Sequence, residues 1–114
     1  MEKSPDDRWI TIVPGIRRQT IASGAEMMQM RVRLDAGSHL PEHQHPHEQL
    51  TYVVSGRLHM RLAGTLYDLG AGEAVNIPGG TPHSADVPED SFVIDTFSPP
   101  RDDYLALDRA AAGK

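Results

Sequence analysis

The sequence predicts an all-β fold, a small sandwich or barrel of short strands, followed by one short helix at the carboxyl end. Glycine and proline recur at short intervals, and the runs between them are rich in Val, Ile, Thr and aromatic residues with period-two alternation. Many short strands at such spacing are typical of a sandwich or a closed barrel. Only DDYLALDRAAA, residues 102–112, has helical character, with Tyr104, Leu105 and Leu107 available to pack back.

The strands can be placed between turn signals. Ser55-Gly56 and Ala63-Gly64 are typical of tight connections, and residues 70–72 and 79–80 supply glycines where a positive φ is expected. We expect strands at residues 9–13, 18–22, 26–34, 49–54, 57–62, 65–69, 74–77, 83–86 and 91–97.

Residues 26–34 contain good helix formers, but their pattern favours a strand. Apolar residues alternate with Gln29, Arg31 and Arg33 along the run. The methionines at positions 28 and 30 are therefore interpreted as core-filling side chains rather than ligands.

Length, charge and cysteine content limit the domain number, the partners and the metal ligands that this chain can have. The 114 residues fit a single domain, 1–114, with a barrel core at about 26–98. Sixteen acidic and 11 basic residues give a net charge of −5 without a basic cluster, which argues against a nucleic-acid partner. With no cysteine, a metal must be held by imidazole, carboxylate or amide oxygen. The charged amino terminus and the lack of a long apolar run predict a cytoplasmic protein that does not enter a membrane.

The most informative residues are histidines. His43 and His45 are two positions apart, a spacing that places both imidazoles on one face of a strand. His83 follows far downstream in IPGGTPHS, so two separated segments can close one metal site. His39 and His47 are expected at the rim or entrance, with contact to the ligands as the alternative. His59, within a strand, is interpreted as a hydrogen-bonded histidine.

The spacing of glycine, proline and histidine over residues 37–87 resembles the two sequence motifs of the cupin superfamily, whose fold is a double-stranded β-helix, or jelly-roll, barrel. The resemblance implies four metal ligands: His43, His45, Gln49 and His83. Two positions depart from the usual pattern, because Gln49 replaces a glutamate and Val87 replaces an asparagine. Glu48 should face away from the ligands.

An amide in place of a carboxylate changes the chemistry of the site. A neutral set of three histidines and one glutamine leaves a divalent ion its full charge, which makes it a stronger Lewis acid and gives less support to a higher oxidation state. Zinc or nickel is therefore favoured as the cofactor, with iron or manganese as alternatives.

A second resemblance covers nearly the whole chain. VIDTFSPPRDDYL, together with PEHQHPHEQ and IPGGTPH, is similar to the small KdgF-type pectin-degradation cupins, which linearise unsaturated uronates. The resemblance implies catalytic roles for Asp95, Phe97 and Arg101. From the residues alone, Asp95 can equally be a satisfied strand carboxylate, Phe97 a core residue, and Arg101 a surface cation paired with Asp102 or Asp103.

The function implied is a metal-dependent enzyme that opens 4,5-unsaturated monouronates to 5-keto-4-deoxyuronate in pectin or alginate breakdown. The alternatives are a cupin cyclase or lyase acting on another substrate, and a small-ligand-binding or sensory cupin without turnover. By analogy with other small cupins we expect a homodimer, with residues 9–13 as candidates for the contact.

Overall fold

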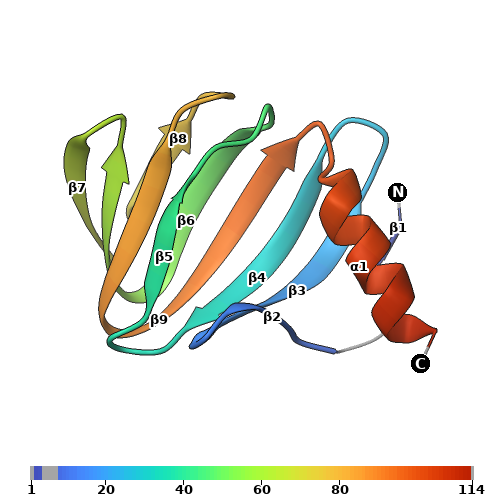
Figure 1. Ribbon diagram of the computed structural model, residues 1–114, viewed down its shortest axis with the longest axis horizontal. Coiled ribbons are helices and arrows are strands. Elements are labelled where there is room, and N and C mark those ends of the chain that lie inside the picture. Colours follow the sequence, from blue (N-terminus) through green and yellow to red (C-terminus); the bar gives the residue numbers. More distant parts are fainter. Residues whose placement is uncertain (1, 4–7, 114) are drawn as a thin grey trace.

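The computed structural model describes residues 2–3 and 8–113 and confirms the all-β fold with one carboxyl-terminal helix (Figure 1). Nine strands, all paired antiparallel, and the helix follow one another along this part of the chain. They are β1 (Glu2–Lys3), β2 (Ile10–Val13), β3 (Ile16–Ser23), β4 (Met28–Leu34), β5 (His39–His43), β6 (Glu48–Leu62), β7 (Thr65–Gly70), β8 (Ala74–Ile77), β9 (His83–Ser98) and α1 (Asp102–Ala112).

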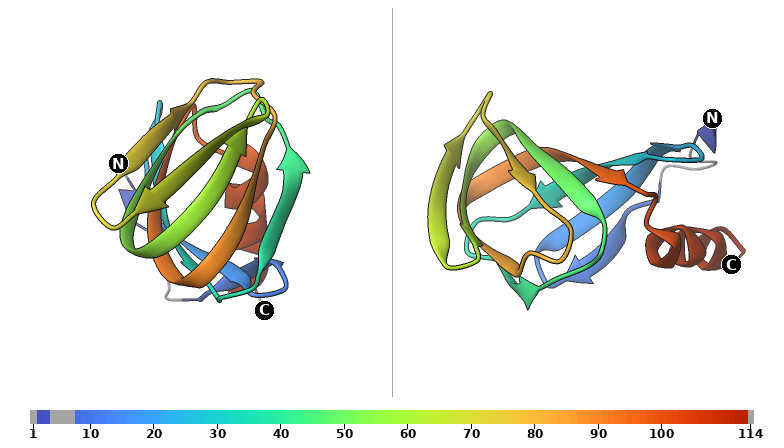
Figure 2. Two further views of the ribbon diagram at one scale, coloured as in Figure 1. Left: turned by 90° about the vertical axis from the view of Figure 1, so that its left-hand side faces the viewer. Right: turned by 90° about the horizontal axis from the view of Figure 1, so that it is seen from above.

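Two long strands, β6 and β9, form the spine of the barrel. They pair with each other from Glu48 opposite Ser98 to Leu62 opposite His83. β4 and β8 flank one half of this ribbon, and β5 and β7 flank the other half. Figure 2 shows the resulting strands curling around a common interior, with α1 outside the barrel. Residues on the inner faces of β6 and β9 therefore meet inside the barrel.

The predicted tight turn at Ser55-Gly56 is wrong, because β6 runs through this position as one strand. Gly56 has a φ of +90°, and a Cβ there would lie 2.4 Å from the carbonyl oxygen of Asp90. The pairing with β9 shifts register on both sides of it, which is the mark of a β-bulge. The bulge changes which alternate positions face inward: Gln49, Thr51 and Val53 before it, and Leu58, Met60 and Leu62 after it.

Other boundaries differ in smaller ways. β9 joins two predicted strands into one, and β5 was not predicted, because its HLPEH sequence is polar and contains a proline. The Ala63-Gly64 turn is confirmed, with φ values of 48° and 86°. Positive φ values also occur at Gly72 and Gly80.

The core consists of inward side chains from nearly every strand, and Met28 and Met30 belong to it as expected, with 1% and 2% exposure. Its buried residues are Ile16, Met28, Met30, Val32, Leu34, Val53, Leu58, Met60, Leu62, Leu69, Ile77, Ala85, Val87, Val93 and Phe97.

A buried cation attaches helix α1 to the barrel. Arg18 on β3 has no solvent exposure and donates to Asp108 Oδ1 at 3.0 Å and to the carbonyl of Tyr104 at 3.2 Å. Its guanidinium also lies 4.1 Å from the centroid of the Tyr104 ring. Tyr104 and Leu105 pack against the core, whereas the expectation for Leu107 is wrong, because its side chain is exposed.

Among the described residues, no helix combines the length and apolar character that a bilayer crossing requires. The single domain of residues 1–114 stays a prediction, and residues 1, 4–7 and 114 lie outside the described part of the chain.

Replacing Asp108 with alanine should destabilise the protein by about 3 kcal/mol, because the buried Arg18 cation then loses its counter-charge. Chemical denaturation measures this. The control is Asp35→Asn, which removes the exposed partner of Arg17 and should change stability by less than about 0.5 kcal/mol. Equal effects of the two substitutions would contradict the role given to Arg18.

Candidate metal centre

The candidate site lies where β5, the loop after it, and the beginnings of β6 and β9 come together. His43 ends β5 and lies opposite His83, the first residue of β9. His45 follows in the loop, so the expected strand placement holds for His43 only. The backbone N–H of Gly80 donates to the carbonyl of His45 at 2.8 Å. The loop before β9 therefore holds the backbone that carries His45.

Three imidazoles converge there. Ligand nitrogens of His43, His45 and His83 all lie within 4.8 Å of one another. The ring centroids of His43 and His83 are 4.1 Å apart, and those of His45 and His83 are 5.0 Å apart. Neutral imidazole is a common ligand of Zn²⁺ and other divalent transition metals, so this cluster can hold a metal ion.

The hydrogen bonds of the three rings determine which nitrogen is available. Each Nδ1 lies at hydrogen-bond distance from a backbone carbonyl: His43 from Pro41 at 2.9 Å, His45 from His47 at 3.1 Å and His83 from Thr81 at 2.8 Å. A carbonyl only accepts, so each Nδ1 carries a proton, and in the neutral form of each ring the lone pair lies on Nε2. Nε2 of His83 is buried with no hydrogen-bond partner, which is the condition of a ligand atom facing a metal position.

Gln49 supplies a fourth acceptor beside these nitrogens. Its Oε1 lies 3.0 Å from Nε2 of His45, while its Nε2 donates to Thr51 Oγ1 at 2.9 Å. Burial lowers the pKa of His45 to about 4, with a further contribution from the nearby Arg101 cation. The neutral His45 ring and the Gln49 amide therefore turn two lone pairs toward each other. A cation between them relieves this repulsion, so the residues fit a bound metal.

Asp95 lies just behind the amide. It faces inward from β9, directly opposite Thr51, and its Oδ1 accepts from the Thr51 hydroxyl at 2.8 Å. Burial raises the pKa of Asp95 to about 6, although hydrogen bonds from Thr51 and Gln49 and the charge of Arg101 act in the opposite direction. A carboxyl group with this pKa can exchange a proton near neutral pH.

Phe97 and Arg101 complete the neighbourhood. Phe97 is 1% exposed, and its ring meets that of His45 edge-on at 5.8 Å between centroids. Arg101 is also buried; its guanidinium lies 5.2 Å from the Phe97 ring and 3.9 Å from the Tyr104 ring. Nε and Nη2 of Arg101 donate to Asp103 at 3.0 and 2.9 Å. This pairing holds the pKa of the Asp103 carboxyl below its ordinary value.

One interior cavity of about 50 Å³ connects these residues. It has room for an ion and a few small groups, but less than the volume of a typical ligand pocket. Its polar and aromatic lining includes His43, Gln49, Thr51, His83, Asp95, Phe97, Arg101 and Tyr104.

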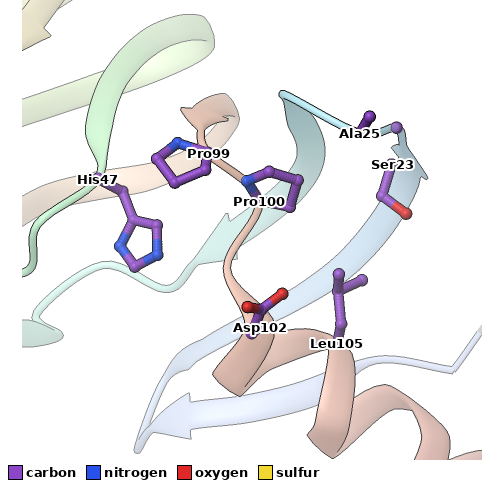
Figure 3. Close-up of a pocket in the computed structure, with 8 residues that line it drawn as sticks. Ser23, Ala25, His47, Pro99, Pro100, Asp102 and Leu105 are labelled. Atoms are coloured by element: carbon purple, nitrogen blue, oxygen red, sulfur yellow. The ribbon is translucent and has the colours of Figure 1, made fainter.

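The remaining histidines lie around the site rather than in it. The His47 side chain lines an open cleft of about 510 Å³ with Ser23, Pro100 and Leu105 (Figure 3), and its backbone carbonyl accepts from His45. His39 is exposed, with Nδ1 2.8 Å from Asp86 Oδ1. Nε2 of His59 lies 3.4 Å from a carboxylate oxygen of Asp68.

Two residues of the site were not predicted. Thr51 follows Gln49 by two positions and faces inward with it, a signal that strand alternation contains but that residue type does not single out. The ring of Tyr104 contacts the guanidinium groups of both Arg18 and Arg101, which the sequence separates widely. Glu48, as expected, is exposed on the opposite face of β6.

The chain is similar in sequence to known proteins. A model of the cupin domain matches residues 30–94. The pectin degradation protein KdgF of Dickeya dadantii is 31% identical over 99 residues, which are 85% of this chain and 90% of that protein.

Two solved structures are similar over most of their length. KdgF from a Halomonas species is 40% identical with a TM-score of 0.82, covering 86% of this chain and 91% of that one. An RmlC-like cupin from Shewanella frigidimarina is 34% identical with a TM-score of 0.81, covering 85% and 87%. This chain therefore belongs to the cupin family, in which it is a homologue of the KdgF pectin degradation protein.

Proposed function

We propose that this protein is a metal-dependent enzyme that opens 4,5-unsaturated monouronates to linear 5-keto-4-deoxyuronates in pectin or alginate breakdown. The names of the homologous KdgF proteins support a role in pectin degradation. The observation that carries the proposal is the convergence of histidine and glutamine acceptors at a cavity that Asp95 and Arg101 also line. A carboxyl group, a guanidinium and a cation-binding cluster are the groups that such a ring opening requires.

In the proposed site, the metal would be held by Nε2 of His43, His45 and His83 and by Oε1 of Gln49. These donors are neutral, which favours zinc or nickel over iron or manganese. When bound, the metal would supply a Lewis acid of full +2 charge beside the oxygen atoms of the substrate.

Asp95 is proposed to carry the proton. It removes the proton of the anomeric hydroxyl; the C1–O5 bond breaks, C1 becomes an aldehyde, and O5 leaves as an enolate that retains the C4–C5 double bond. Return of the same proton to C4 converts the enolate into the 5-keto group. The reaction is an isomerisation in which no water is consumed, so one carboxyl group suffices as base and then as acid.

Arg101 is proposed to bind the C6 carboxylate of the sugar, and Phe97, whose ring centroid lies 5.2 Å from the guanidinium, to offer a ring face to the sugar. Arg101 is the charged group suited to this role, because its planar fork matches a carboxylate. In the structure Asp103 occupies two donors of this fork. We therefore expect the exposed Asp103 side chain to release Arg101 when the substrate enters.

The association of two copies of the chain through residues 9–13 stays a prediction.

The metal site is tested by replacing His83 with alanine. The purified variant should lose bound metal, measured by elemental analysis after dialysis, because one of three converging imidazoles is gone. His39→Ala removes an exposed histidine outside the cluster and should keep the metal content of the unmodified protein. Equal loss in both variants would contradict the assignment.

Turnover is tested with metal-loaded protein and unsaturated galacturonate, following the loss of ultraviolet absorbance as the double bond disappears. Asp95→Asn should lower kcat/KM by about 10²- to 10⁴-fold while retaining the metal. Asp86→Asn, an exposed change on the same strand, should leave the rate unchanged. If the unmodified protein binds the sugar without converting it, the binding or sensory alternative is supported; conversion of a different substrate would support the cyclase or lyase alternative.

Asp103→Asn tests whether the internal carboxylate competes with that of the substrate. Asparagine is a weaker hydrogen-bond partner for Arg101 than aspartate and competes less with the substrate. KM should therefore fall by roughly 3- to 10-fold with little change in kcat. Asp102→Asn removes the same charge from the same helical turn and should leave KM unchanged. A rise in KM for Asp103→Asn alone would instead show that Asp103 holds Arg101 in its working position.

A further inference from the structure

We propose that Thr51 is a positioning residue that fixes the orientation of the Gln49 amide, so that its oxygen rather than its NH₂ group faces the three histidines. This inference rests on the proposed metal site and assigns a function to a residue that touches neither the metal position nor the histidines. Thr51 is 2% exposed and lies next to Gln49 on the inner face of β6.

The hydrogen bonds of Thr51 run in one direction, from Gln49 to Thr51 and from Thr51 to Asp95. The Thr51 hydroxyl has one proton, which it donates to Asp95 Oδ1 at 2.8 Å. Its oxygen can then only accept, and Gln49 Nε2 donates to it at 2.9 Å, while the same NH₂ group also donates to the Asp95 carboxylate behind it. With the NH₂ group engaged on this side, Gln49 Oε1 points to His45, 3.0 Å from its Nε2.

An amide in the reversed orientation would lose its hydrogen bond to Thr51 and would turn no lone pair toward the histidines. Its oxygen would face the Thr51 oxygen, whose only proton is already given to Asp95, and two acceptors would meet in a buried place. Its NH₂ group would face the histidine nitrogens and offer a metal no lone pair. The two orientations therefore differ in hydrogen bonding at Thr51 and in metal binding at Gln49.

The need for a fixed side-chain orientation arises because residue 49 is a glutamine. A carboxylate has two equivalent oxygens and presents a ligand atom in either orientation, whereas an amide has one oxygen. The cupin pattern commonly has glutamate where this chain has Gln49. The threonine two positions later, with Asp95 opposite it, gives the amide the orientation that a glutamate would not need.

The test compares Thr51→Val with Thr51→Ser. Valine keeps the shape but removes the hydroxyl, and serine keeps the hydroxyl. Titration of each metal-free protein with Co²⁺, followed by visible absorption, and with Zn²⁺ by calorimetry gives the affinity and the ligand field. We expect Thr51→Val to bind about 10- to 100-fold more weakly with an altered cobalt spectrum, and Thr51→Ser to restore both.

A second comparison, in a protein that carries Gln49→Glu, separates the positioning role of Thr51 from a role in packing. In Gln49→Glu protein, adding Thr51→Val should change the cobalt affinity by less than about threefold, because a carboxylate has no wrong orientation. Thermal unfolding of the metal-free variants checks that all are folded.

The possible outcomes are distinguishable. If the unmodified protein binds Co²⁺ and Thr51→Val binds it equally tightly with the same spectrum, the role of Thr51 is overturned and the metal site stands. Equal weakening by Thr51→Val in the glutamine and glutamate backgrounds also overturns it in favour of packing. If the unmodified protein binds neither metal, the metal site itself is overturned, and this inference with it.

Discussion

The constraint that organises the candidate site is the convergence of acceptor lone pairs, because nitrogens of three imidazoles lie within 4.8 Å of one another and the amide oxygen of Gln49 lies beside the nitrogen of His45. Each ring is turned there by an Nδ1–H donated to a backbone carbonyl, and the amide is turned by Thr51. Buried acceptors that face one another without a donor are unfavourable, and a cation converts the same arrangement into a favourable one. The site is thus organised for an ion by its hydrogen bonds.

The barrel architecture supports this convergence. The paired strands β6 and β9 bring Gln49 and Thr51 opposite Phe97 and Asp95, so the proposed ligand, its positioning residue and the proposed proton carrier share one ribbon. Helix α1 begins one residue after Arg101, and its attachment through Arg18 and Tyr104 holds that guanidinium beside the cavity. The packing of α1 on the outside of the barrel therefore positions the positive charge of Arg101 at the cavity.

Most of the fold could be predicted from the sequence, because strand alternation and turn residues are local signals. Residues 74–77 were predicted with the observed boundaries, and the helix at 102–112 likewise. The bulge at Gly56 was mistaken for a turn, since both require a glycine with positive φ and only the partner strand distinguishes them. Strand β5 was missed because its sequence, HLPEH, is polar and contains a proline. The pairing of β5 with β9, which joins segments far apart in the sequence, is what shows it to be a strand.

The sequence alone specifies the chemical groups and their approximate faces: histidines at spaced positions, a glutamine in place of a glutamate, and Asp95 and Phe97 on one side of a strand. Tertiary structure decided which groups act on one another. The hydrogen bonds from Gln49 to Thr51 and from Thr51 to Asp95, and the contacts of the Tyr104 ring with the guanidiniums of Arg18 and Arg101, join residues of different elements or depend on burial. The pairing of Arg101 with Asp103, two residues apart, was within reach of the sequence. Hydrogen-bond direction and desolvation are properties of a closed interior, and strand periodicity carries no information about them.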